Sequence, residues 1–261
     1  MKAYAAFART RFADLLANRS RFVMGIISYF IYVSVYAAIF RAIYRGSTGE
    51  VGGLQATEAL TYVAVAWVLR SFYTNSLDRD ITQEVVRGDI VQVLLRPVDY
   101  PASKLAVAAG EAVTRALIFT LPAGMLVFVA YGVQPPANPL AASGFLTSVV
   151  LAFAIYTQVN LLVGIAAVFT EHTIGLQRSK NAMMDLFGGV LLPLTFFPVW
   201  AQEALFLLPF QAVTYTPVAI YLGKLGILSG LAVQALWFML LAVLVRLSWR
   251  QALVRLTVHG G

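Results

Sequence analysis

Long stretches without a charged residue constrain this chain more than any other feature of its sequence. Residues Phe22 to Phe40 form an uncharged run of 19 residues, and residues Leu225 to Val245 form one of 21. At a rise of about 1.5 Å per residue, helices of this length cross the roughly 30 Å hydrocarbon core of a bilayer. Hydrophobic residues make up 60% of the chain and charged residues 12%. We therefore predict an all-α integral membrane protein with no separate soluble domain.

Breaks in the apolar pattern divide the chain into six predicted transmembrane helices within one transmembrane domain, 1–261. The helices are expected at 22–43, 57–77, 105–131, 144–169, 182–198 and 225–248. The preceding residues, 1–21, combine five basic residues with apolar residues at helical spacing, which predicts an amphipathic helix on the membrane surface. With six spans, fourteen Lys and Arg residues lie on the same side of the membrane as the N-terminus and three on the opposite side. Because cytoplasmic loops are enriched in Lys and Arg, both termini are predicted to be cytoplasmic.

The fifth predicted segment is irregular. Glycine and proline residues interrupt it and the stretch that follows: Gly188, Gly189, Pro193, Pro198, Pro209 and Pro217. Because proline removes a helical hydrogen bond and clashes with the preceding turn, two regular spans are difficult to build here. We expect one helix from Ala182 to about Leu194 that stops short, followed by an extracellular re-entrant hairpin at 199–219 that does not cross the membrane.

The most polar connection, 78–104, holds five of the twelve acidic residues. Its spacing predicts a helix, broken at Gly88 and ended by Arg96 and Pro97, with an apolar stripe and a polar face. The stripe comprises Ile81, Val85, Ile90, Val93 and Leu94, and the polar face comprises Asp80, Glu84, Arg87 and Asp89. Such a helix can pass force to a partner outside the bilayer, but a plain hydrophilic connector would have the same pattern.

Several functions are disfavoured by what the sequence lacks. The chain has no cysteine, which excludes disulfides, thiolate nucleophiles and cysteine metal sites. It also has no G-x-x-x-x-G-K-[ST] motif, which could hold the phosphates of a nucleotide. The basic residues flank apolar segments, where they set orientation, so nucleic-acid binding is not expected. The predicted spans contain few ionisable residues, which argues against a carrier driven by protons or sodium.

Four polar residues within the predicted spans have a structural and a functional interpretation. Glu111 and Arg115 are one helical turn apart, which favours a structural ion pair at the cytoplasmic interface. Gln158 and Asn160 lie in the middle of the fourth span, where amides usually bond to neighbouring helices and sometimes to a transported substrate.

Taken together, these features resemble the transmembrane subunits of ABC-2 type ABC exporters, in particular the compact six-helix bacterial branch with a type V exporter-like fold. The resemblance covers nearly the whole chain. It rests on the N-terminal helix with six spans, on the loop EVVRGDIVQVLLRPVDY, and on GGVLLPLTFFPVW followed by LLPF.

The resemblance implies that the chain is a non-catalytic permease of the bacterial plasma membrane, in contact with membrane lipids. Two cytoplasmic ATP-binding cassette subunits would hold the ATP and Mg, leaving no cofactor in this chain. A second permease chain, identical or paralogous, would complete a pathway for an amphipathic, lipid-like, glycan or drug substrate, exported by alternating access. The coupling residues would be Ile81, Glu84, Val85, Arg87, Gly88, Asp89, Arg96 and Pro97, and the substrate pathway would include Gln158, Asn160, Phe196 and Phe197.

Two alternatives from other classes remain open on the sequence. An ion-coupled carrier or a channel would work without an ATPase partner. A membrane scaffold would anchor a cytoplasmic complex and would not need the outer hairpin.

Overall fold

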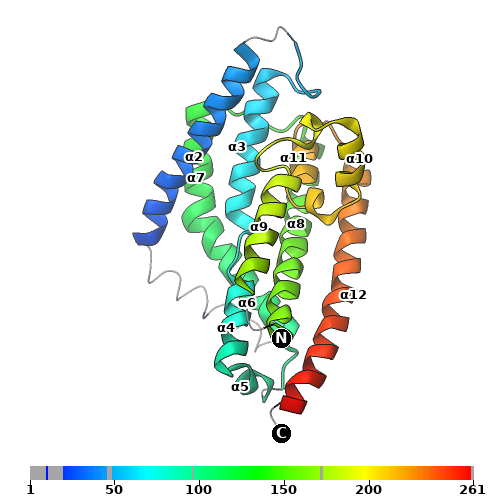
Figure 1. The fold of residues 1–261 in the computed structure, drawn as a ribbon. Helices are drawn as coiled ribbons and strands as arrows, with labels where there is room; N and C mark the ends of the chain where they lie inside the picture. Colours follow the sequence, from blue (N-terminus) through cyan, green and yellow to red (C-terminus); the bar gives the residue numbers. More distant parts are fainter. Residues whose placement is uncertain (1–9, 11–19, 46–48, 96, 171–172, 260–261) are drawn as a thin grey trace.

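A computed structural model describes residues 10, 20–45, 49–95, 97–170 and 173–259 of the chain, so the surface helix predicted at 1–21 lies almost entirely outside it. Helices run lengthwise through the molecule, and shorter helices gather at its two ends (Figure 1). The lengthwise helices are α2 (Ser20–Arg45), α3 (Ala56–Tyr73), α6 (Tyr100–Arg115) continued by the π-helix η1 (Ala116–Thr120) and α7 (Leu121–Tyr131), α8 (Pro139–Ile165), α9 (Ile174–Phe187) and α12 (Ile227–His259).

The short helices define the two ends. At one end lie α4 (Leu77–Arg87) and α5 (Ile90–Leu94), which we call the α4 end. At the other, the α11 end, lie α10 (Val199–Phe206) and α11 (Tyr215–Tyr221), with η3 (Leu194–Phe196) and η4 (Pro209–Ala212) (Figure 1). The C-terminal part of α12 reaches the α4 end.

Four helices in the described residues are long and apolar enough to cross a membrane. They are α2, the continuous α6–η1–α7 helix, α8 with the short η2 (Ala166–Val168), and α12. The remaining two lengthwise helices are shorter or carry charges. Helix α3 has 18 residues and contains Glu58 and Arg70, and α9 has 14 residues, a length of about 21 Å.

Helix α9 differs from the helix expected at 182–198. It begins eight residues earlier, at Ile174, because the polar residues Gln177 and Lys180 are buried against neighbouring helices and do not form a solvated loop. It ends at Phe187, and Gly189 then adopts a φ of +89°, which a residue without a Cβ tolerates.

The segment from Gly188 to Gly226 stays at the α11 end. Its first residue contacts the start of α11, where the Tyr215 N–H donates to the Gly188 carbonyl at 3.0 Å. The Tyr221 hydroxyl donates to the Gln134 carbonyl at 2.7 Å, and Lys224 pairs with Glu58 at 2.9 Å. Helix α12 holds the segment in place, since Gln234 donates to the Ala212 carbonyl at 2.7 Å and accepts a bond from Ser148 of α8 at 2.8 Å.

Two apolar clusters form the interior. The larger surrounds α3 and includes Tyr62, Trp67 and Tyr73, and the smaller lies at the α4 end and includes Ile81, Tyr100 and Trp249. Much apolar surface remains outside both clusters, for example Ile31 and Val35 on α2 and Met239 on α12. Surfaces of this kind are covered by lipid or by another chain.

Candidate functional site

Helices α4 and α5 form a compact charged element between two lengthwise helices. Asp78 and Asp80 lie in the first turn of α4, where negative charge favours the helix dipole. Gly88 ends α4 with a φ of +77°, and its N–H donates to the Val85 carbonyl at 3.1 Å. After α5, the Asp99 side chain accepts a bond from the Ala102 N–H at 2.8 Å and so caps α6. Arg96 lies outside the described residues, and Pro97 is exposed before α6 begins.

The apolar stripe of this element packs against the rest of the chain. Ile81 and Ile90 are buried, and Val85, Val93 and Leu94 are partly buried against the cluster at the α4 end. Gly164 of α8 allows the closest approach, because a Cβ there would lie 2.8 Å from the Ile81 Cβ. The stripe therefore fixes α4 to α8.

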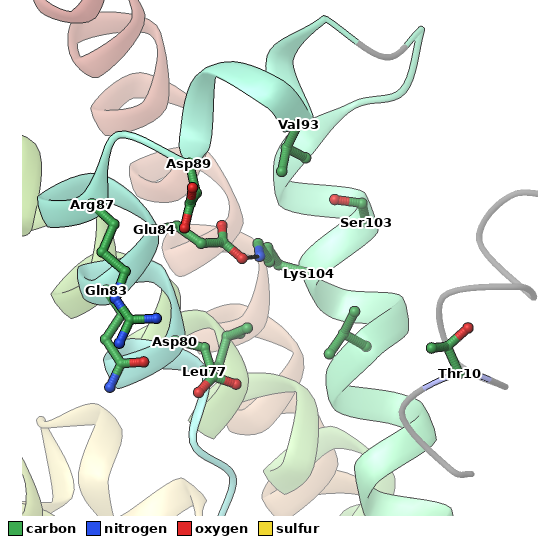
Figure 2. A pocket seen from close by; sticks show the side chains of 11 residues that line it. Thr10, Leu77, Asp80, Gln83, Glu84, Arg87, Asp89, Val93, Ser103 and Lys104 are labelled. Carbon is green, nitrogen blue, oxygen red and sulfur yellow. Dashed lines mark hydrogen bonds and ion pairs between the residues drawn. The ribbon is translucent and has the colours of Figure 1, made fainter. Parts of the chain in front are cut away.

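Glu84 does not face away from the molecule as its spacing suggested. Its carboxylate accepts a hydrogen bond of 2.7 Å from the Tyr100 hydroxyl and forms an ion pair with Lys104, toward which it turns in Figure 2. Tyr100 stacks on Trp249 of α12 with ring centroids 4.4 Å apart. Glu84 thus joins α4 to α6, and Tyr100 continues the contact to α12.

The outer face of the element is open. Gln83, Arg87 and Asp89 are exposed, together with Val86 at 66% relative exposure. Glu84, Arg87, Asp89 and Lys104 also line a pocket of about 370 Å³, which Figure 2 shows between α4 and α6. This face presents both signs of charge and an apolar side chain, which suits docking of another protein.

A buried polar cluster lies under the start of α4. Asp78 accepts a bond of 2.7 Å from the Lys180 ammonium of α9, and Lys180 also donates to the Asn160 side-chain oxygen of α8. The Asn160 amide donates to Asn75 at 2.8 Å, and Asn75 donates to Thr157 at 3.3 Å. The cluster ties α4, α8 and α9 together.

A comparison with protein families now assigns the chain. A family model described as an ABC-2 family transporter protein matches residues 18–260. The chain belongs to the ABC-2 transporter family. No curated protein matches it.

Membership makes this chain a multi-pass membrane protein and the permease component of an ABC transporter. ABC-2 permeases are transmembrane subunits that associate with ATP-binding cassette subunits, on which the ATPase activity resides. The family resemblance inferred from the loop and fifth-segment sequences is confirmed.

The four predicted pathway residues of the ABC-2 permease lie in different surroundings. Asn160 belongs to the buried polar cluster, and Gln158 is buried with a side-chain oxygen that has no partner within the described residues. Phe196 packs on Phe40 of α2, with ring centroids 5.7 Å apart, and covers Gly52. Phe197 is partly exposed beside it. The two amides of α8 and the two phenylalanines after α9 therefore do not form one site.

The sequence interpretation missed an ion pair in the middle of the permease. Arg70 of α3 donates to Asp185 of α9 through two bonds of 2.6 and 2.7 Å, and the guanidinium lies over the Trp67 ring. The side chains are 29% and 23% exposed. Two lone, opposite charges in apolar segments were the signal that could have revealed the pair.

Proposed function

We propose that this permease forms an exporter with a second permease chain, identical or paralogous, and with two ATP-binding subunits docked on α4 and α5. The α4 end is cytoplasmic in this proposal, and α3 and α9 complete six passages through the bacterial plasma membrane. Segment 188–226 then forms the outer re-entrant element. The concentration of Lys and Arg at the α4 end supports this orientation.

One observation carries the proposal. The inner side of α4–α5, opposite its exposed charged face, contacts three lengthwise helices directly and a fourth through Tyr100. Ile81 packs on α8, Glu84 binds α6, and Asp78 binds Lys180 of α9. Tyr100 relays the α6 contact to α12. A push on this face moves a rigid, packed element, because protein interiors resist compression. ATP-driven closure of the partner subunits would therefore shift these helices as a group and alternate the access of the pathway.

The Arg70–Asp185 pair supports a pathway on the face formed by α2, α3 and α9. An ion pair that is about one quarter exposed at membrane depth cannot face lipid tails without a large cost, so it faces water or another protein chain. Tyr32 and Tyr36 lie against Trp67 on the same face. Aromatic rings beside a charged pair suit a cargo with polar and apolar parts.

Co-purification tests the proposal. The tagged permease is isolated from its native membrane in mild detergent, and the co-purifying proteins are identified by mass spectrometry. We expect an ATP-binding cassette subunit in equal number to the permease chains.

Matched variants then test the docking face. The change of Arg87 and Asp89 to Ala removes one charge of each sign from α4–α5 and should reduce co-purification or transport-coupled ATPase activity. Arg45 and Glu50, exposed at the α11 end, provide the control pair. Transport by the permease alone would instead favour an ion-coupled carrier or a channel. Equal behaviour of the two double variants would show that the ATP-binding subunits do not dock on this face.

A further inference from the structure

A second pocket opens beside the polar cluster, on the opposite side of α4 from the pocket in Figure 2. It has a volume of about 390 Å³ and lies between the end of α3, the start of α4, α8 and the first turns of α9. Its volume falls in the range of small-molecule sites, about 300–1,000 Å³. The residues that decide its chemistry are Asn75, Asp78, Arg79, Gln177, Arg178 and Lys180.

The lining of this pocket is cationic. It contains three basic side chains, Arg79, Arg178 and Lys180, and one acidic side chain, Asp78. Asp78 is bound to Lys180 at 2.7 Å, so these two charges compensate each other. Arg79 and Arg178 are exposed, and neither guanidinium pairs with a carboxylate in the described part of the chain. Two guanidinium groups thus remain available to a ligand.

The floor of the pocket is already ordered. Asn75 is buried and bonded to Thr157 and Asn160, and Gln177 is buried and donates to Thr82 at 3.2 Å and to Thr173 at 3.0 Å. Gln177 also lies in the first turn of α9, whose N-terminal N–H groups carry partial positive charge. A preformed polar floor and two free guanidinium groups favour an anion with several oxygens, because guanidinium binds such groups through paired hydrogen bonds.

The surface above the pocket is apolar. Ile174 lines the mouth and is 62% exposed, and Met183 and Leu186 are exposed farther along α9, at 45% and 38%. A ligand with its anionic group between Arg79 and Arg178 would therefore find apolar surface for a hydrocarbon tail.

We propose that this pocket binds the phosphate group of an anionic amphiphile, which is either an anionic membrane phospholipid or the lipid-like cargo itself. This inference rests on the proposed function, which places the pocket at the inner face of the membrane. Inorganic phosphate presents the same oxygens without the tail and is the competing source. Since Arg79 belongs to α4 and Arg178 to α9, a bound phosphate would link α4 to α9.

Lipid titration tests the pocket. The permease with its ATP-binding subunits is placed in nanodiscs of phosphatidylcholine, and phosphatidic acid is added in increasing fraction. We expect saturable binding by native mass spectrometry. The double variant Arg79→Gln and Arg178→Gln should bind phosphatidic acid about tenfold more weakly or worse, because two charge-assisted contacts are lost.

Two comparisons decide the outcome. Arg246 and Arg250, exposed on the part of α12 near the α4 end, are changed to Gln as the matched control, which should bind as the parent does. Equal weakening of both double variants would show general attraction to the surface and would overturn the pocket. Arg178→Lys keeps the charge but loses the paired hydrogen bonds of the guanidinium, so its binding should fall between that of the parent and that of Arg178→Gln. Binding of Arg178→Gln equal to that of the parent would count against the pocket.

A competition experiment on the same samples identifies the source of the phosphate. Competition by inorganic phosphate at similar concentrations would assign the pocket to a free anion, whereas competition only by lipids would assign it to an amphiphile. Unchanged binding in the Gln variants overturns this inference but leaves the proposed function standing. The proposed function fails separately if no ATP-binding subunit co-purifies.

Discussion

Glu84 and Arg87 are one helical turn apart on α4, but their side chains have different surroundings. Glu84 is bound to Tyr100 and Lys104 inside the chain, whereas Arg87 is exposed on the face that we propose as the docking surface. Removing the charge of Glu84 leaves the nearly buried Lys104 ammonium without its anion. Removing the charge of Arg87 leaves the folded permease otherwise unchanged.

We therefore expect Glu84→Gln to lower the free energy of unfolding by about 1–3 kcal/mol. Arg87→Gln should change it by less than about 0.5 kcal/mol and should reduce transport-coupled ATPase activity. Thermal unfolding of the purified permease and ATPase assays of the complex measure the two effects. The assignment is wrong if both variants have the same stability and the same ATPase activity.

The contrast between these two residues also shows how far the sequence could predict the site. Helical spacing identified the stripe of Ile81, Val85 and Ile90, because that pattern is local. It could not identify the partner of Glu84, since Lys104 follows 20 residues later in another helix. The pairs Asp78–Lys180 and Arg70–Asp185 join residues 102 and 115 positions apart. Such pairings depend on how the helices pack, and helical period carries no information about that packing.

At the scale of helices, the contact between α4 and α8 depends on one glycine. A Cβ on Gly164 would come within 2.8 Å of the Ile81 Cβ, which is closer than carbon atoms approach each other, so α4 would have to move. We expect Gly164→Ala to cost about 1–3 kcal/mol and to lower the amount of substrate moved per ATP hydrolysed.

Gly175→Ala on α9 is the control for this change, because, apart from its chain neighbours and the adjacent backbone of α9, no atom lies within 4 Å of the added Cβ. Denaturant unfolding and a paired measurement of transport and ATP hydrolysis test both variants. Equal stability and equal coupling in the two would show that α4 does not act through α8.

The helices themselves divide into those that hydropathy predicts and those that it does not. The spans expected at 22–43 and 225–248 correspond to α2 and α12, whose apolar residues extend around the whole helix. The start of α9 has the composition of a loop, and only burial of Gln177 and Lys180 by α4 and α8 makes it a packed helix. Its early end follows from Gly188 and Gly189, which were predicted as interruptions.

At the scale of the whole molecule, the exposed face of α2, α3 and α9 requires a cover. The Arg70–Asp185 pair lies partly exposed beside Trp67, and Tyr32 and Tyr36 of α2 adjoin the same ring. A second permease chain is the cover that we propose, with the exposed side of α2 facing the same helix of the partner chain.

Because the chain contains no cysteine, disulfide cross-linking can test this arrangement directly. Ile31→Cys on the exposed side of α2 should give a cross-linked species with the mass of two permease chains after mild oxidation. Met239→Cys on α12, which is similarly exposed, should remain a single chain. The absence of the Ile31 product from an active homodimeric complex would show that the two copies of α2 do not face each other at this position.

The orientation of the whole molecule has its own test. Ala204→Cys on α10 should react with a membrane-impermeant maleimide added to intact cells, because the α11 end faces outward in our proposal. Gln83→Cys on α4 should react only after the membrane is opened. Both side chains are exposed, so accessibility reports topology and not burial. The opposite labelling pattern would invert the proposed orientation.

The short length of α9 has a consequence for how the chain is made. A 14-residue helix with Lys180 and Asp185 inserts poorly by itself, since an unpaired charge within a span is costly, with an upper value of about 2.5–3.5 kcal/mol at the centre. The charges that compensate them, Asp78 and Arg70, are synthesised earlier, but Gln234, which holds segment 188–226 against α8, is synthesised last. In the proposed topology, we therefore expect α9 to insert only when α3 and α4 are already in place, and segment 188–226 to be fixed only when α12 has been made. A chain that stops before α12 should keep the ion pairs of α9 but lose the bond from Gln234 that holds segment 188–226.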